Sequence, residues 1–295
     1  MNRTHHNNEL NKSHVGQKVT LLGWVAKRRN FGAMVFIDLR DRNGITQIVI
    51  DETLTDSVKD VRNEYLLEVS GEVLLRKDPN PKLATGEIEV KATKVVLINS
   101  AELTPMIIAD ETDALEDTRL KYRYLDLRRP IMQKRLIQRA KIVQTMRNCL
   151  DNAGFIDIET PLLTKSTPEG SREYLVPSRV HAGQFYALAQ SPQIFKQMLM
   201  VAGLERYYQV ARCFRDEDLR ADRQLDFTQV DIEASFLDEE EFRAIIEAMV
   251  AEVMEKVLGL KLDMPILKMS YADAMNFYGS DKPDLRFGLK LQDVK

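Results

Sequence analysis

Residues 214–233 carry more reactive side chains than any other part of this 295-residue chain. They contain three arginines and seven acids, and apolar, strand-like stretches lie on both sides at 207–210 and 230–236. This pattern predicts two antiparallel strands joined by a long charged loop. A charged loop on a rigid sheet suits a polyanion, and planar arginines beside acids suit a ligand with anionic and base-like parts, such as ATP. The alternative is a solvated loop whose ion pairs are internal.

The residue order in this segment resembles motif 2 of class II aminoacyl-tRNA synthetases. Phe-Arg-Asp-Glu stands at 214–217 and Phe-Thr-Gln-Val-Asp-Ile-Glu at 227–233, and the loop between them resembles the aspartyl-tRNA synthetase version. Leu-Asp at 225–226 departs from the usual Pro-Glu. The resemblance implies one catalytic residue, Arg215, which bridges the amino-acid carboxylate and the α-phosphate. It implies that ATP is bound by Arg215, Asp216, Glu217, Gln224 and Phe227, the last by stacking on adenine.

Two further segments have the features of a small-molecule pocket. Residues 167–174 combine a glycine with an acid, as in a lid over an ammonium group, although a plain surface turn has the same composition. Residues 190–197 predict a helix that begins near Pro192. Lys196 lies in a stretch that we expect to be buried, so it needs a carboxylate partner, and Asp231 is our candidate. The family resemblance implies that aspartate is bound by Glu169, Ser191, Gln193, Lys196, Arg215 and Asp231.

The first hundred residues predict an OB-fold. Alternation predicts strands at 19–25, 34–41, 45–51, 66–75 and 87–98, with a short helix at 56–63 between the third and fourth strands. Five strands with a helix in that place are typical of this barrel, which binds oligonucleotides on its second and third strands and adjoining loops.

Several residues on the expected binding face suit RNA. Phe36 points away from the core face of its strand and could stack on a base, or it could belong to a second small core. Unpaired bases, as in an anticodon loop, are the expected target of such a surface. The module also resembles the N-terminal anticodon-binding domain of aspartyl-tRNA synthetases. That resemblance implies anticodon contacts from Arg29, Phe36, Gln47, Asn80 and Glu89.

Composition limits the class of protein without identifying it. The chain is long enough for two cores, and 44% apolar with 29% charged residues is ordinary for a globular protein. We expect no membrane span and a cytoplasmic location, since neither a long apolar run nor a signal-peptide core is visible. Two distant cysteines and four histidines predict no metal site of the protein's own. A net charge of −3 argues against indiscriminate nucleic-acid coating.

The domain organisation follows from these segments. We expect an α+β chain with an all-β first domain: an OB-fold anticodon-binding domain at 1–104, a hinge at 105–123, and the first part of a class II antiparallel-sheet catalytic domain at 124–283. Residues 284–295 are expected to begin an inserted domain. A long helix, a strand at 155–160 and Pro161 resemble motif 1, which implies a homodimer through that helix.

The resemblance covers essentially the whole chain, as the N-terminal portion of a bacterial-type enzyme, but no Gly-x-x-Arg unit of motif 3 follows residue 260. It implies an aspartate–tRNA ligase with L-aspartate, ATP and tRNA(Asp) as substrates. Mg²⁺ is expected with ATP, its ligands lying outside this stretch. Lysyl- and asparaginyl-tRNA synthetases share the layout and are the nearest rivals. The alternative function is a truncated, catalytically incompetent tRNA-binding fragment or paralogue, and we expect these 295 residues alone to form no aspartyl-adenylate at a useful rate.

Overall fold

The computed structural model describes residues 3–167, 171–218, 220, 223–292 and 294. These residues form two compact units, Met1–Ile137 and Gln138–Lys295. Each unit has its own core, and each is described by itself below.

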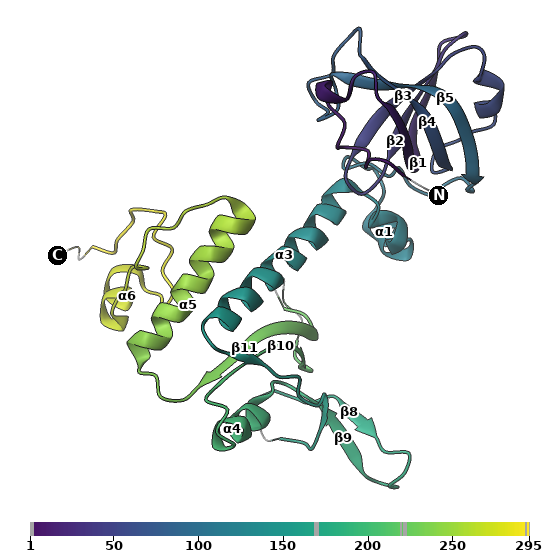
Figure 1. Ribbon diagram of the computed structural model, residues 1–295. Coiled ribbons are helices and arrows are strands. Elements are labelled where there is room, and N and C mark those ends of the chain that lie inside the picture. The colour runs from purple at the N-terminus through teal and green to yellow at the C-terminus, as the bar shows by residue number, and fades with distance from the viewer. Residues whose placement is uncertain (1–2, 168–170, 219, 221–222, 293, 295) are drawn as a thin grey trace. The chain divides into compact units, whose positions relative to one another are not determined.

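The first unit contains the expected closed barrel of five strands (Figure 1). Its strands are β1 (Lys18–Asn30), β2 (Val35–Arg40), β3 (Ile45–Ile50), β4 (Leu66–Leu75) and β5 (Ile88–Asn99), and they close in the order β1-β2-β3-β5-β4. Two short 3₁₀ helices are also present, η1 (Lys12–His14) and η2 (Thr55–Val58). The predicted OB-fold is confirmed. The helix expected at 56–63 is only the single turn η2.

Strand alternation builds the barrel core. In β2, Val35, Ile37 and Leu39 are buried inside, so the side chains between them face outward, as side chains with a period of two must. Gly71 in β4 is required by close contact with β5, because a Cβ at this position would lie 2.3 Å from the backbone oxygen of Lys91.

A buried carboxylate holds together the segment that follows the barrel. This segment contains α1 (Glu116–Lys121) and α2 (Arg123–Asp126), and Asp126 at the end of α2 is fully buried. Its oxygens accept hydrogen bonds from Arg119, Arg123 and Arg129 at 2.6–3.4 Å. Arg129 also donates to the backbone oxygens of residues 109 and 110, so one acid orders the whole segment. The bond from Arg119 is the main cause that lowers the pKa of Asp126 to about 2.

The second unit contains two small sheets and several helices. The first sheet has the order β11-β10-β6 and the second β7-β9-β8. The strands are β6 (Ile156–Asp157), β7 (Leu163–Thr164), β8 (Leu175–Pro177), β9 (Phe185–Leu188), β10 (Arg206–Phe214) and β11 (Asp226–Ala234). The helices are α3 (Pro130–Asn152), which begins in the first unit, α4 (Gln193–Val201), α5 (Glu239–Val253), the π-helical η3 (Met254–Leu258) and α6 (Tyr271–Tyr278). The strand expected at 155–160 is limited to the two residues of β6.

The core of this unit lies between helices and the β10–β11 pair. Leu150 of α3 and Met249 of α5 pack with Tyr208 of β10 and with Val230 and Ile232 of β11. Figure 1 shows the two helices beside this strand pair. This packing covers one face of the strand pair with apolar side chains. The other face is therefore the one that can present polar groups.

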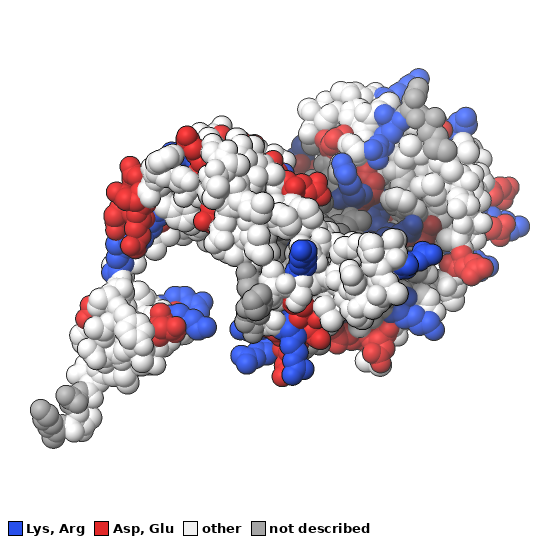
Figure 2. Space-filling model, turned by 90° about the horizontal axis from the view of Figure 1, so that it is seen from below, with Lys and Arg blue, Asp and Glu red and all other residues white. Residues whose placement is uncertain are grey.

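The surface gives two general observations. None of the helices in the described part of the chain is long and apolar enough to cross a membrane. In the view of Figure 2, most of the surface is neither acidic nor basic, and the acidic and basic side chains lie in small groups that often adjoin one another. Binding of a polyanion would therefore depend on local groups rather than on one broad field.

We predict that Asp126→Asn destabilises the first unit by about 2 kcal/mol at pH 7, because a shift of nearly two pKa units has that value. The native pKa is depressed, so this stability is present above the unfolded pKa and is lost as pH falls from about 4 to about 2. Urea unfolding followed by fluorescence of Trp24, the single tryptophan, measures the effect. Glu87→Gln, which removes an exposed acid paired with Lys12 in the same unit, is the control and should change stability by less than about 0.5 kcal/mol. Equal effects of the two substitutions would contradict the prediction.

Candidate functional site

The β10–β11 pair divides its side chains between two faces. The strands are antiparallel, with Gln209 opposite Asp231, Tyr207 opposite Glu233 and Cys213 opposite Phe227. Residues opposite each other share a face, so these side chains lie together on the face away from the apolar core. The predicted hairpin is confirmed, and along β11 about 13 Å separates position 227 from position 231.

Lys196 of α4 reaches this face and is held by two acids. Its Nζ lies 3.0 Å from Oδ1 of Asp231 and 3.2 Å from Oε2 of Glu233. The lysine and Asp231 side chains are only 12% and 11% exposed. Burial alone would lower the pKa of Lys196, but the two carboxylates outweigh it and raise the pKa above 10.5. The lysine is therefore charged at neutral pH, and the expected ion pair with Asp231 is present.

The helix around Lys196 is more exposed than the sequence led us to expect. Ile194 and Met198 are exposed, and none of the α4 residues is fully buried. The lysine is shielded by the strand pair rather than by its own helix. The prediction of a buried α4 is therefore wrong, whereas the prediction that Lys196 has a carboxylate partner stands.

A buried hydrogen-bond network lies beside the lysine. Oε1 of Gln209 accepts hydrogen bonds from the hydroxyls of Tyr207 and Thr160, both at 2.9 Å. Burial, followed by the nearby charge of Asp231, raises the pKa of Tyr207 well above its ordinary value, so its hydroxyl remains a donor. Burial also raises the pKa of Asp231 despite its bond to Lys196, and its Oδ2 has no hydrogen-bond partner among the described residues. That oxygen is an acceptor which a bound donor would satisfy.

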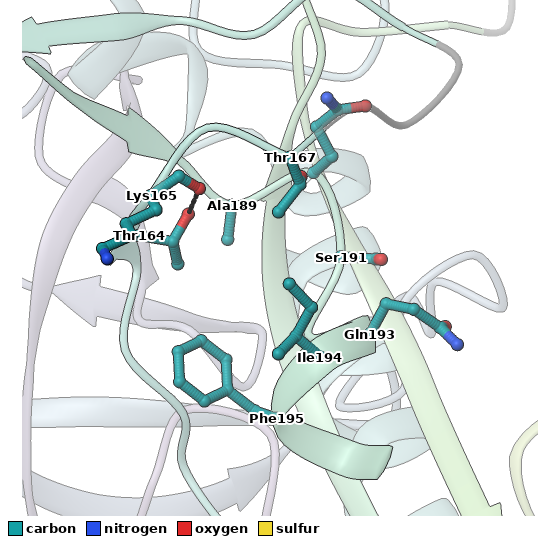
Figure 3. A pocket seen from close by; sticks show the side chains of 9 residues that line it. Thr164, Lys165, Thr167, Ala189, Ser191, Gln193, Ile194 and Phe195 are labelled. Atoms are coloured by element: carbon teal, nitrogen blue, oxygen red, sulfur yellow. Dashed lines mark hydrogen bonds between the residues drawn. The ribbon is translucent and has the colours of Figure 1, made fainter. Parts of the chain in front are cut away.

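The residues at 189–195 form one wall of a cavity of about 220 Å³, lined by Thr164, Lys165, Thr167, Ala189, Gln190, Ser191, Gln193, Ile194 and Phe195. In Figure 3, Phe195 and Ile194 lie toward Thr164 and Ala189, whereas Ser191 and Gln193 point to the opposite side. The start of α4 thus separates an apolar recess from a polar side. Glu169, the remaining residue expected to bind aspartate, lies outside the described residues.

Arg215 and Phe227 meet at the other end of the strand pair. The guanidinium carbon of Arg215 lies 5.0 Å from the centre of the Phe227 ring, in a cation–π arrangement. The backbone of Asp216 bonds to the backbone oxygen of Arg172, and Glu217 accepts a hydrogen bond from Arg223 at 3.0 Å. Of the five residues expected to bind ATP, Arg215, Asp216 and Glu217 directly follow β10, and Phe227 is the second residue of β11. Gln224 lies two residues before β11 and is exposed.

The barrel carries a second candidate site. A cavity of about 340 Å³ is lined by Arg29, Phe31, Met34, Phe36, Gln47, Arg76, Lys77, Asp78 and Glu89. Four of the five residues expected to contact an anticodon are in this list. Asn80 is not, because its side chain instead accepts a hydrogen bond from the backbone N–H of Lys82 in the loop between β4 and β5.

Hydrogen bonds fix the polar groups of this cavity. Arg29 donates to Asp38 at 2.7 Å and to Gln47 at 3.1 Å, and Gln47 donates to Glu89 at 2.7 Å. Burial raises the pKa of Asp38, against the lowering effect of the neighbouring arginines. Nε of Arg29 and Nη2 of Arg76 are buried and have no partner within the described chain. Two fixed donors are thus left for a ligand's acceptors.

Sequence reasoning missed several neighbours of these sites. Phe31 packs edge-on against Phe36, with ring centres 5.8 Å apart, and is 70% exposed. Its position in a short turn just before β2 was the sequence feature that could have identified it as part of this site. Glu233, Tyr207 and Gln209 were also missed, although strand alternation places all three on the same face as Asp231.

Comparison with known families agrees with this geometry. Residues 115–295 match the family described as tRNA synthetases class II (D, K and N), and residues 19–98 match the OB-fold nucleic acid binding domain. The first match alone covers more than half of the chain. The chain belongs to the class II tRNA synthetases of the D, K and N group.

Relatives of this class II synthetase chain include two bacterial proteins. It is 56% identical over 294 residues to the aspartate–tRNA ligase of Lysinibacillus sphaericus (strain C3-41), covering 98% of this chain and 50% of the relative. It is 55% identical over 298 residues to the aspartate–tRNA(Asp/Asn) ligase of Geobacillus sp. (strain WCH70), covering 99% and 50%. The chain therefore spans about half the length of the curated relatives it matches.

Solved structures share the fold of this class II synthetase chain. Asparaginyl-tRNA synthetase from Pyrococcus horikoshii, complexed with asparaginyl-adenylate, superposes with a TM-score of 0.77 at 24% identity, covering 88% of this chain and 59% of that one. A putative aspartyl-tRNA synthetase from Leishmania major Friedlin gives 0.75 at 24% identity, covering 87% and 53%. These likenesses establish the barrel followed by part of a class II catalytic domain.

We predict that Phe36→Ala in the 295-residue chain weakens binding of an RNA stem-loop carrying the tRNA(Asp) anticodon by roughly 5- to 150-fold, because base stacking contributes about 1–3 kcal/mol per base. Fluorescence anisotropy with a labelled stem-loop measures the dissociation constant. Tyr124→Ala removes an exposed aromatic side chain of α2, outside the cavity, and is the matched control. If both variants bind as tightly as the parent, Phe36 has no stacking role.

Proposed function

We propose that this chain is part of an aspartate–tRNA ligase, which activates L-aspartate with ATP and transfers the aspartyl group to the 3′ end of tRNA(Asp). The observation that carries the proposal is Lys196, held by Asp231 and Glu233 on the same strand pair that presents Arg215 and Phe227. The names of the two bacterial relatives support the same activity. Because one of those names specifies tRNA(Asp/Asn), tRNA(Asn) belongs in the test of the second step.

Lys196 is suited to read the side chain of the amino acid. An ammonium group has three N–H donors, and Asp231 and Glu233 occupy two of them. The side-chain carboxylate of aspartate would take the third donor or replace Glu233, whose side chain is the more exposed of the two acids. An asparagine amide would leave the lysine facing a neutral group, so charge supplies the discrimination. Ser191, Gln193 and Glu169 are proposed to hold the ammonium group of the substrate.

The reaction would proceed in two displacements. A carboxylate oxygen of aspartate attacks the α-phosphorus of ATP and pyrophosphate leaves, after which a ribose hydroxyl of the tRNA attacks the aspartyl carbonyl and AMP leaves. Neither step needs a protein nucleophile, so the protein contributes orientation and charge stabilisation. Arg215 is proposed to bridge the aspartate carboxylate and the α-phosphate with its planar fork, which a lysine could not reproduce.

The other ATP contacts are proposed from the loop around Arg215. Phe227 would stack on adenine, and Asp216, Glu217 and Gln224 would contact the nucleotide. Mg²⁺ is expected to accompany the phosphates of ATP. In the described residues, clusters of three or more side chains that could hold a metal ion are absent, so we assign no ligands to Mg²⁺.

The barrel is proposed to bind the anticodon of the tRNA. Phe36 would stack on a base, and the buried unpartnered donors of Arg29 and Arg76 would be satisfied by base acceptors. Gln47 and Glu89, fixed by their mutual hydrogen bond, would read base edges. Asn80 remains a proposed contact from the neighbouring loop.

Assembly and location complete the proposal. A homodimer through α3 is supported by exposed apolar side chains on that helix, namely Ile131, Leu136 and Ile137. The domain boundaries expected from the sequence remain proposals, as does a cytoplasmic location, which follows from the substrates.

A second function would rest on the barrel site alone, whose polar side chains are fixed by their own hydrogen bonds. On that alternative, the chain is a tRNA-binding fragment or paralogue without aminoacylation activity. Aspartate-dependent exchange of pyrophosphate into ATP separates the two functions. Robust exchange by the 295-residue chain would remove the alternative, whereas anticodon binding without exchange in every form of the protein would favour it.

We predict that Lys196→Gln, in the protein as the gene encodes it, lowers kcat/KM for aspartate in this exchange assay by at least about 30-fold. Removing one partner of a buried ion pair commonly costs 2–5 kcal/mol, and it leaves Asp231 and Glu233 facing each other. Lys256→Gln breaks an exposed pair with Glu252 and is the matched control. A loss of the same size in both variants, or none in Lys196→Gln, would contradict the role of the lysine. Gain of exchange with asparagine would support it.

A further inference from the structure

The two ends of the segment 166–173 are joined by one carboxylate. Glu173 accepts hydrogen bonds from the hydroxyl of Ser166, and from the backbone N–H and hydroxyl of Thr167 at 2.7 and 3.1 Å. We propose that Glu173 is a positioning residue for the amino-acid pocket, setting the place of the pocket wall without touching the substrate. This inference rests on the proposed function.

The contacts of Glu173 lead directly to the cavity wall. Thr167 and Gln190 both line the cavity beside Ser191 and Gln193. The Gln190 side chain is buried and is itself fixed, because it donates to the backbone oxygen of Ser171 at 3.1 Å and accepts from the hydroxyl of the same residue. Ser171 is therefore attached directly to the turn that precedes α4, and Glu173 joins Thr167 to the same end of the segment.

A second attachment links the segment to the phosphate end of the site. Arg172, next to Glu173, forms a backbone bridge to Asp216, with the Asp216 N–H donating to the Arg172 oxygen at 3.0 Å. Asp216 directly follows Arg215 in the chain. This bridge is formed by backbone atoms of Arg172 and Asp216 and does not involve the Glu173 side chain. We therefore expect it to persist when Glu173 is replaced, so that the effect falls on the amino-acid wall.

The type of residue at 173 fits this role. Burial works against ionisation of Glu173, but the hydrogen bonds from Ser166 and Thr167, with a contribution from Gln190, outweigh it and lower its pKa below 4.5. The carboxylate is thus charged at neutral pH and accepts several hydrogen bonds. Hydrogen bonds to a charged acceptor are among the stronger ones in proteins. A glutamine would keep the shape and could still accept from the Thr167 N–H, whereas an alanine would release both ends of the segment.

The experiment measures aspartate-dependent pyrophosphate exchange in the protein as the gene encodes it. For Glu173→Ala we expect KM for aspartate to rise at least about tenfold, since small displacements of positioning groups have large kinetic effects. KM for ATP and kcat should each change less than about threefold. Glu173→Gln should restore KM to within about threefold of the parent. Asp238→Ala, which removes a carboxylate that accepts the Glu241 N–H at the start of α5, is the matched control and should lower stability without changing KM.

A merely structural role predicts a different result. An unchanged KM for aspartate in Glu173→Ala, or an equal rise in Asp238→Ala, would overturn the inference, as would a glutamine variant no better than alanine. Hydrogen exchange of the Thr167 amide supplies a readout that needs no activity: its protection should fall in Glu173→Ala and be kept in Glu173→Gln and Asp238→Ala. If the parent shows no aspartate-dependent exchange, the proposed function fails, and unchanged protection of Thr167 would separately overturn the attachment by Glu173.

Discussion

The antiparallel pairing of β10 and β11 is the constraint on which both the core and the candidate active site depend. With a side-chain period of two, Tyr208, Val230 and Ile232 point toward α3 and α5, and the residues between them point to the opposite face. Val230 and Asp231 are neighbours in sequence, yet one contributes to the core and the other holds Lys196. A shift of one residue in register would bury the acids and expose the core, so stability and function enforce the same pairing.

The barrel uses the same principle with a different outcome. Val35 and Ile37 fill its interior, while Phe36 between them lies on the outer face with Gln47 and Arg29. There the polar side chains are held by one another through a chain of hydrogen bonds from Arg29 to Glu89. Such mutual fixation lowers the entropy that must be lost when a ligand binds. Both sites are thus built on strands, with side chains whose positions are set before any ligand arrives.

The alternation of apolar and polar residues along the strands explains why so much of the fold could be predicted from the sequence. It predicted the bounds of the five barrel strands to within one residue, except that β1 continues to Asn30 instead of ending at residue 25. It also placed Phe36 on the face that the structure gives it. What could not be predicted depends on partners distant in the chain. The exposure of Met198, the attachment of Thr167 by Glu173 and the burial of Asp126 by three arginines leave no periodic signal, because each depends on where a loop or helix end packs. The positions of strands follow from the local sequence pattern, whereas the conformation of a loop depends on its contacts with residues far away in the chain.

Two ion pairs in the candidate active site differ in their exposure to solvent, which decides how easily a ligand can replace one partner. Lys196 and Asp231 are almost fully shielded, so separating them would leave a charge without solvent or partner. Arg223 and Glu217 are paired at a similar distance, but the arginine side chain is 55% exposed, and such pairs contribute at most about 1 kcal/mol. A phosphate could therefore recruit Arg223 at little cost, while no ligand could readily recruit Lys196 away from Asp231. The Lys196 end of the strand pair is thus fixed, whereas the loop end can exchange its ionic partners.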